Sequence, residues 1–237
     1  YDGDLRFRSA TGEILEDHLP PEEYLDWIGE ASLRESYLKA PYFKPQGFPD
    51  GVYRVGPLAR MNVIDHCGTP RADAELLEFR QRFDSPAHSS FLFHYARLIE
   101  IVYALERIAM LLDDPQILDT HIRATGGVNA LEGVGMIEAP RGVLIHHYKV
   151  NENGGIVWAN LIVATGHNNL AIGRSIQQVS EHFIDGTKLQ EGMVNRVAAV
   201  VRAYDPCLSC STHAIGQPAL DISLLGPSGQ LLDHLLT

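Results

Sequence analysis

The chain has 237 residues, of which 45% are hydrophobic and 21% charged, the composition of a globular protein with a sizeable core. Its formal net charge of -11 argues against nucleic-acid or anionic-membrane partners, because these require a basic face. No apolar run approaches the roughly 20 residues that cross a bilayer, and the polar start at Tyr1 argues against a signal peptide. Three cysteines do not make a disulfide framework, so we expect a reducing compartment.

The first predicted elements are short. Residues 5–8 (Leu-Arg-Phe-Arg) are typical of a strand, and a turn at residues 10–13 follows them. Pro20 and Pro21 open an acidic, amphipathic helix over residues 22–28. Residues 37–56 are rich in Tyr, Phe, Pro and Gly, which predicts an ordered loop and leaves two interpretations open, a connecting loop and a docking surface.

The strongest helical pattern covers residues 91–112, after a surface-helix pattern at residues 73–82. Asp113-Asp114-Pro115 ends the longer helix. Apolar residues recur along it at helical spacing, and others lie off that stripe, namely Ile101, Met110 and Leu111. We therefore predict a long helix that is buried on most sides and forms the centre of the core.

Glycine and proline interrupt the pattern after this helix. Three glycines and a proline between Glu132 and Gly142 indicate a backbone held close to another segment. The elements predicted beyond it are strands at 143–150 and 156–164 joined as a hairpin, a polar loop at 165–169, helices at 175–184 and 191–204, and a small apolar hairpin at 219–225 and 230–236. Together they predict a helix-dominated α+β fold with a long buried core helix and a β-hairpin.

The segment from Asp205 to His213, Asp-Pro-Cys-Leu-Ser-Cys-Ser-Thr-His, carries the most distinctive chemistry. Two residues separate Cys207 from Cys210, a gap that lets both sulfurs reach one metal ion, and His213 follows. Three interpretations stay open on spacing alone: a metal site such as zinc with a fourth ligand from elsewhere, a redox-active thiol pair, and inert cysteines. Cys67 by itself is typical of a small buried hydrophobe.

Arg141 is a second candidate, because Pro140 restricts the backbone before it and Gly142 frees the backbone after it. A guanidinium held in this way can pair with a carboxylate or polarise a small substrate. The alternative is an ordinary surface arginine in a turn.

Three stretches together resemble the large, catalytic subunit of [NiFe] hydrogenases, and most of all the cytoplasmic, bidirectional, NAD-reducing group. They are residues 205–213, Glu138-Ala139-Pro140-Arg141-Gly142, and residues 160–166 (Asn-Leu-Ile-Val-Ala-Thr-Gly). Supporting stretches are residues 53–60, 93–97 and 168–171. The resemblance runs along essentially the whole chain and implies a fold like that of the hydrogenase large subunit.

The resemblance also implies roles for single residues. Cys207 resembles the terminal nickel thiolate, and Cys210 the thiolate that bridges nickel to an iron carrying cyanide and carbon monoxide. Arg141 resembles the arginine above the open metal position. The remaining counterparts are Asp205, its carboxylate partner; Pro140, a wall of the pocket; Thr165, a hydroxyl donor to cyanide; and His213, a ligand of a second ion, usually magnesium.

The implied activity is reversible H2 oxidation and proton reduction coupled to NAD(P)+/NAD(P)H. The implied partners are an iron–sulfur small subunit, flavin diaphorase subunits and a maturation endopeptidase. Alternatives from other classes are a non-catalytic relative like the NADH–quinone reductase subunit of the same fold and a zinc-stabilised interaction module.

Two departures from the family pattern limit what the resemblance implies for this chain. The family's centre takes four cysteines, and its N-terminal Cys-x-x-Cys pair and proton-accepting glutamate have no match here. Residues 1–213 are therefore expected to be the C-terminal part of a large subunit that is inactive alone. The mature family protein ends at the histidine matching His213, so residues 214–237 are expected to be a precursor extension that is removed.

Overall fold

The computed structural model describes residues 3–34, 36–123, 129–212 and 221–236. The chain divides into two compact units, and each is described by itself. The first unit is Tyr1–Leu25 with Gly56–Ile162, and the second is Asp26–Val55 with Val163–Thr237. None of the helices in the described ranges combines the length and the apolar character that a membrane span needs.

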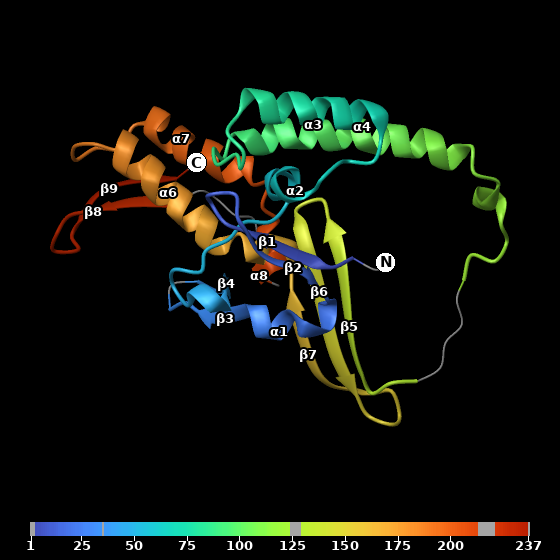
Figure 1. The fold of residues 1–237 in the computed structure, drawn as a ribbon. Helices are drawn as coiled ribbons and strands as arrows, with labels where there is room; N and C mark the ends of the chain where they lie inside the picture. Colours follow the sequence, from blue (N-terminus) through green and yellow to red (C-terminus); the bar gives the residue numbers. More distant parts are fainter. Residues whose placement is uncertain (1–2, 35, 124–128, 213–220, 237) are drawn as a thin grey trace. The chain divides into compact units, whose positions relative to one another are not determined.

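The first unit pairs small antiparallel sheets with helices (Figure 1). Its strands are β1 (Leu5–Arg8) and β2 (Ile14–Leu19), which form one sheet, and β5 (Glu132–Ala139), β6 (Gly142–Val150) and β7 (Ile156–Ile162), which form an antiparallel meander. Its helices are η1 (Pro21–Glu23), α2 (Pro57–Val63), α3 (Pro70–Arg82), α4 (Leu92–Leu112) and η3 (Pro115–Leu118), and α1 (Tyr24–Trp27) begins in this unit. Helices α3 and α4 lie side by side.

The second unit contains the segment with the cysteine pair. Its strands are β3 (Ile28–Ser32) paired with β4 (Lys39–Phe43), and β8 (Asp221–Leu225) paired with β9 (Leu231–Leu236). Its helices are η2 (Lys44–Gln46), α5 (Ala164–His167), α6 (Asn169–Phe183), α7 (Glu191–Ala203) and α8 (Leu208–Thr212). Helices α6 and α7 pack on each other, and α5 contacts β4 and α8.

The α+β fold class is confirmed, and the predicted hairpin of β6 and β7, the helices α6 and α7 and the terminal hairpin of β8 and β9 are all present. Several segments differ from the prediction, among them the following three. Part of the expected loop at residues 37–56 is strand β4, the glycine-rich run from Glu132 is strand β5, and the expected polar loop at residues 165–169 is helical. In each case pairing or packing with distant residues outweighs the local preference of the sequence.

The prediction that the long helix is buried on most sides was wrong. Helix α4 buries only Phe93, Ala96 and Ile99, all in its first half. Leu105 is 62% exposed and Leu112 is 67% exposed. The apolar residues occupy more of the helix surface than α2 and α3 cover, so a face of α4 stays open.

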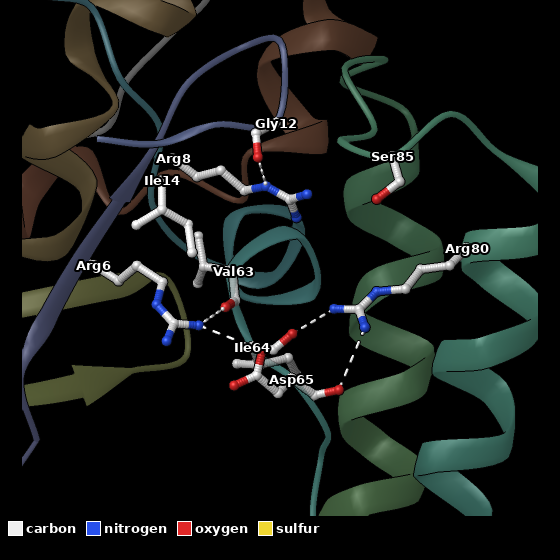
Figure 2. A pocket seen from close by; sticks show the side chains of 9 residues that line it. All are labelled: Arg6, Arg8, Gly12, Ile14, Val63, Ile64, Asp65, Arg80 and Ser85. Carbon is white, nitrogen blue, oxygen red and sulfur yellow. Dashed lines mark hydrogen bonds and ion pairs between the residues drawn. The ribbon is translucent and has the colours of Figure 1, made fainter. Parts of the chain in front are cut away.

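The C-terminal end of α2 is fixed by three arginines that line a pocket of about 280 Å³ (Figure 2). Arg6 donates to the Val63 carbonyl (2.8 Å), Arg8 donates to the Asn62 carbonyl, and Arg80 donates to the Met61 carbonyl (2.9 Å) and the Ile64 carbonyl. The last carbonyls of a helix lack partners within it and carry its negative dipole end, so three guanidinium groups suit this position. The C-terminal end of helix α2 is therefore held firmly.

Candidate functional site

The cysteine pair lies directly after α7. That helix ends at Ala203, and the buried Tyr204 anchors its end through a hydrogen bond between its hydroxyl and Ser175 Oγ on α6 (2.9 Å). The next residue, Asp205, has φ +52°, a left-handed conformation that Asp tolerates better than most residues. The chain thus turns sharply away from α7 before Cys207.

The sulfurs of Cys207 and Cys210 converge. The two residues form a disulfide, with their Cα atoms 5.4 Å apart, across the start of α8. Thiolates and not disulfides bind metals, so the pair would act as ligands in its reduced form. Among the residues that the structure describes, no group of three or more His, Cys, Asp or Glu side chains could hold a metal ion.

Thr165 contacts the cysteine segment directly. The residue is 3% exposed on α5, and its Oγ1 accepts a hydrogen bond from the backbone N–H of Cys207 (3.1 Å). Because a hydroxyl both accepts and donates, the O–H hydrogen of Thr165 is left to donate to another acceptor. The structure thus brings together Thr165 and Cys207, two of the residues singled out from the sequence, over 42 positions of chain.

Two residues that the sequence analysis did not assign hold α5 in place. Asn168 is 2% exposed, and its side-chain amide pairs with the backbone of Val55, whose N–H donates to Oδ1 (2.9 Å). Nδ1 of His167 hydrogen-bonds the hydroxyl of Tyr53 (2.5 Å). Burial raises the pKa of Tyr53 well above its ordinary value of 10.0, so the phenol stays neutral. The only sign of these contacts in the sequence is that residues 53–60 and 168–171 are among the stretches that resemble the hydrogenase family.

Pro140 and Arg141 lie in the first unit, at the tip of the β5–β6 hairpin, where Ala139 pairs with Gly142. Thr165, Asp205, Cys207 and Cys210 lie in the second unit, and His213 lies outside the described residues. The expected pairing of Arg141 with Asp205 joins the two units and stays a prediction.

Cys67, the third cysteine, lies in a different environment. Burial, together with the negative charge of Asp73, raises the pKa of its thiol to about 11. A neutral thiol is a poor metal ligand. Cys67 is only partly buried, so it is a protonated thiol but not the fully buried hydrophobe that the sequence predicted.

The chain matches the family model of nickel-dependent hydrogenases over residues 16–213. It is 41% identical over 238 residues to the NAD-reducing hydrogenase HoxS subunit beta of Cupriavidus necator, covering 99% of this chain and 49% of that protein. It is 42% identical over 228 residues to one chain of the F420-non-reducing hydrogenase vhc of Methanococcus voltae, covering 94% of this chain and 48% of that protein.

The solved structures agree. An NAD+-reducing [NiFe]-hydrogenase in its H2-reduced state matches with a TM-score of 0.84 at 44% identity, over 90% of this chain and 47% of that one. The [NiFeSe] hydrogenase of Desulfovibrio vulgaris Hildenborough matches with a TM-score of 0.52 at 24% identity, over 90% of this chain and 44% of that one, and shares the fold. The chain spans about half the length of the relatives it matches. It belongs to the nickel-dependent hydrogenase family, the family of [NiFe]-hydrogenase large subunits.

Proposed function

We propose that this chain is the C-terminal part of the catalytic subunit of a bidirectional [NiFe] hydrogenase and supplies half of its nickel–iron centre. The observation that carries this is the convergence of Cys207 and Cys210 beside Thr165, in a chain of the nickel-dependent hydrogenase family. Two soft thiolates from one turn suit nickel and iron. When bound, the metal pair supplies the Lewis-acid centre at which H2 is split.

The chain's own residues prepare the site around the metals. Thr165 fixes the backbone of Cys207 and keeps an O–H with which to donate to a cyanide ligand of the iron, which would tune the centre. Arg141 brings a fixed positive charge and Asp205 a negative one, and such a pair supplies a preorganised field in a dry pocket. Pro140 helps to exclude water, and His213 holds a second ion, magnesium.

The proposed electron partners, located in the cytoplasm, are an iron–sulfur small subunit together with flavin diaphorase subunits that reduce NAD(P)+. The 41% identity to a protein whose name is NAD-reducing hydrogenase supports this choice. The two alternatives, a non-catalytic relative and a zinc-stabilised module, gain no support from membership in a nickel-dependent family.

Residues 214–237 are proposed to be removed by a maturation endopeptidase once nickel is inserted. The family match ends at residue 213, and β8 and β9 beyond it form a separate two-stranded sheet. That sheet is attached through Asp233, which accepts a hydrogen bond from the backbone N–H of Leu189 (2.7 Å). Intact-mass measurement of the large subunit from the active complex should find an end at His213, and retention of residues 214–237 there would contradict the proposal.

The complete complex tests the function. It should contain nickel and reduce NAD(P)+ with H2, and Cys207→Ser should remove nickel or activity, because the hydroxyl that replaces the thiol is a poor ligand for nickel. Cys67→Ser, the same exchange at the cysteine outside the pair, is the control and should retain both nickel and activity. A folded, mature complex without nickel, or a fully active Cys207→Ser variant, would overturn the proposal.

A further inference from the structure

The two-residue turn at Pro140 and Arg141 is not of a type that fixes the geometry of a hairpin by itself. Pro140 and Arg141 are the only residues between the paired Ala139 and Gly142. Two-residue hairpins favour turns with positive φ at their first central residue, because these match the twist of the strands. Among the described non-glycine residues only His18 and Asp205 have positive φ, so the turn at Pro140 is of another type. Contacts with a neighbouring element must therefore hold it.

Helix α2 supplies these contacts through Arg60. Its Nη2 donates to the Pro140 carbonyl (2.8 Å), and its Nη1 donates to the Ala139 carbonyl (2.9 Å) and to the carboxylate of Glu138. The Arg60 side chain is 17% exposed. The Pro140 carbonyl belongs to the peptide group that precedes Arg141, so Arg60 fixes the backbone on that side.

A second carboxylate orients Arg60 itself. Glu100 on α4 receives Nε (2.5 Å) and Nη2 (2.8 Å) of Arg60 on its two oxygens. This bidentate geometry fixes the plane of a guanidinium, and a lysine ammonium cannot reproduce it. The direction of the remaining N–H groups toward the hairpin is thereby set.

Gly56, the residue before α2, fixes the backbone on the other side of Arg141. Its φ is +90°, and a Cβ atom added there would lie 2.8 Å from the Arg141 carbonyl oxygen. The two backbones therefore touch at a point where a side chain has no room. Both peptide groups that flank Arg141 are therefore in contact with α2 or with Gly56, the residue that precedes α2.

We infer that Arg60 is a positioning residue for Arg141, aiming its guanidinium through the backbone of the β5–β6 turn. The inference rests on the proposed function, in which Arg141 acts at the metal pair. Arg60 holds Arg141 in a productive direction without touching the metals, so its loss slows turnover and leaves nickel in place. A displacement of a reacting group by about 1 Å can cost as much as 100-fold in rate.

The test is a double-mutant cycle in the assembled, mature complex, with nickel content, the KM for H2 and kcat measured for each variant. The variants are Arg60→Lys, Arg141→Lys and the two together. Arg60→Lys should lower kcat roughly 10-fold to 100-fold at normal nickel content and little-changed KM. In the Arg141→Lys background the same change should lower kcat by less than about 2-fold, because the group being aimed is already gone.

Arg6→Lys is the matched control. Arg6 also pairs with a carboxylate through two hydrogen bonds, to Asp17, and donates to a helix carbonyl, but it lies at the opposite end of α2. It should lower thermal stability and leave kcat unchanged. If Arg60→Lys does not assemble, Glu100→Gln, which keeps the shape of the orienting side chain, takes its place in the cycle with the same expectations.

Equal effects of Arg60→Lys on kcat in both backgrounds would overturn the inference, as would a kcat unaffected by it, while the proposed function would stand. A wild-type complex without nickel and without H2 oxidation would instead refute the proposed function.

Discussion

At the scale of single residues, the arginines of this chain differ in what fixes them. Arg6, Arg8 and Arg80 donate to carbonyl groups at the end of α2, and Arg60 donates both to carboxylates and to the turn before Arg141. Because the planar guanidinium has five N–H donors, one side chain can join three chain segments. The sequence offers these four arginines without distinction, and only their distant partners separate their roles.

Arg141→Lys should slow turnover of the assembled complex sharply while nickel remains bound. An ammonium keeps the charge but cannot match the fork of the guanidinium, and removal of a preorganised charged donor costs on the order of 100-fold or more in rate. Nickel analysis and H2-dependent dye reduction measure the two quantities. Loss of nickel in this variant would show that Arg141 is structural, and Arg174→Lys, at an exposed arginine, provides the comparison.

Asp17 makes the stability of the first unit sensitive to acid. Its hydrogen bonds with Arg6 hold the pKa of its carboxyl below the ordinary value of 3.8. A carboxyl whose pKa is lower in the folded state adds stability above its unfolded pKa, and that stability is lost as the pH falls through the folded value. Asp17→Asn should therefore reduce the free energy of unfolding at about pH 7, and the difference from wild type should shrink below about pH 4.

Urea unfolding at a series of pH values measures this difference. Asp50→Asn, at an exposed carboxylate, controls for the loss of one charge. A deficit for Asp17→Asn that stays constant down to about pH 2 would disprove the linkage.

At the scale of helices and strands, the sequence predicts those elements that form through a local pattern of residues. The strands β6 and β7 and the helices α6 and α7 follow from periodicity over consecutive residues. Strand β5 was missed because Gly133 and Gly135 weaken the local preference, and only pairing with β6 makes it a strand. The segment at residues 165–169 looks like a polar loop in the sequence. In the structure it is helical, and its polar side chains hydrogen-bond to partners that are more than 40 residues away, which the local sequence does not reveal.

The same limit applies to the candidate site. The spacing of Cys207 and Cys210 is visible in the sequence, and so is the placement of Arg141 between Pro140 and Gly142. The role of Arg60 is not visible in the sequence, because Glu100 lies 40 residues away from it and Pro140 lies 80 residues away. Hydrogen bonds over such separations depend on the fold and leave no periodic trace.

Gly56→Ala should destabilise the contact between α2 and the β5–β6 turn. Its φ of +90° is unfavourable for alanine, and the new Cβ would lie 2.8 Å from the Arg141 carbonyl oxygen. Backbone strain of this kind costs about 1–3 kcal/mol. Denaturant unfolding measures the loss, and Gly173→Ala is the control, because it lies within α6 with no atom within 4 Å of its added Cβ. That change should stabilise the chain by up to about 1 kcal/mol, and equal effects of the two would contradict the argument.

At the scale of the whole molecule, α4 presents an apolar stripe that the described parts of the chain leave open. Leu98, Ile101, Leu105, Ile108 and Leu112 are each more than half exposed and recur at alternating intervals of three and four residues. This interval is the pattern with which one helix packs along another in a coiled coil. A continuous exposed seam of Leu and Ile is unusual on a monomer and favours association.

The 237-residue chain on its own should therefore self-associate through α4. Size-exclusion chromatography with light scattering should give a mass above that of one chain, and Leu105→Gln combined with Ile108→Gln should shift it toward one chain. The helix should persist in this variant, since glutamine is a good helix former, so the circular dichroism spectrum should be unchanged. Leu77→Gln, at a residue of α3 that is 59% exposed and lies outside the seam, should not change the mass. A wild-type chain that elutes as a monomer, or an equal response to both substitutions, would show that the seam does not drive association.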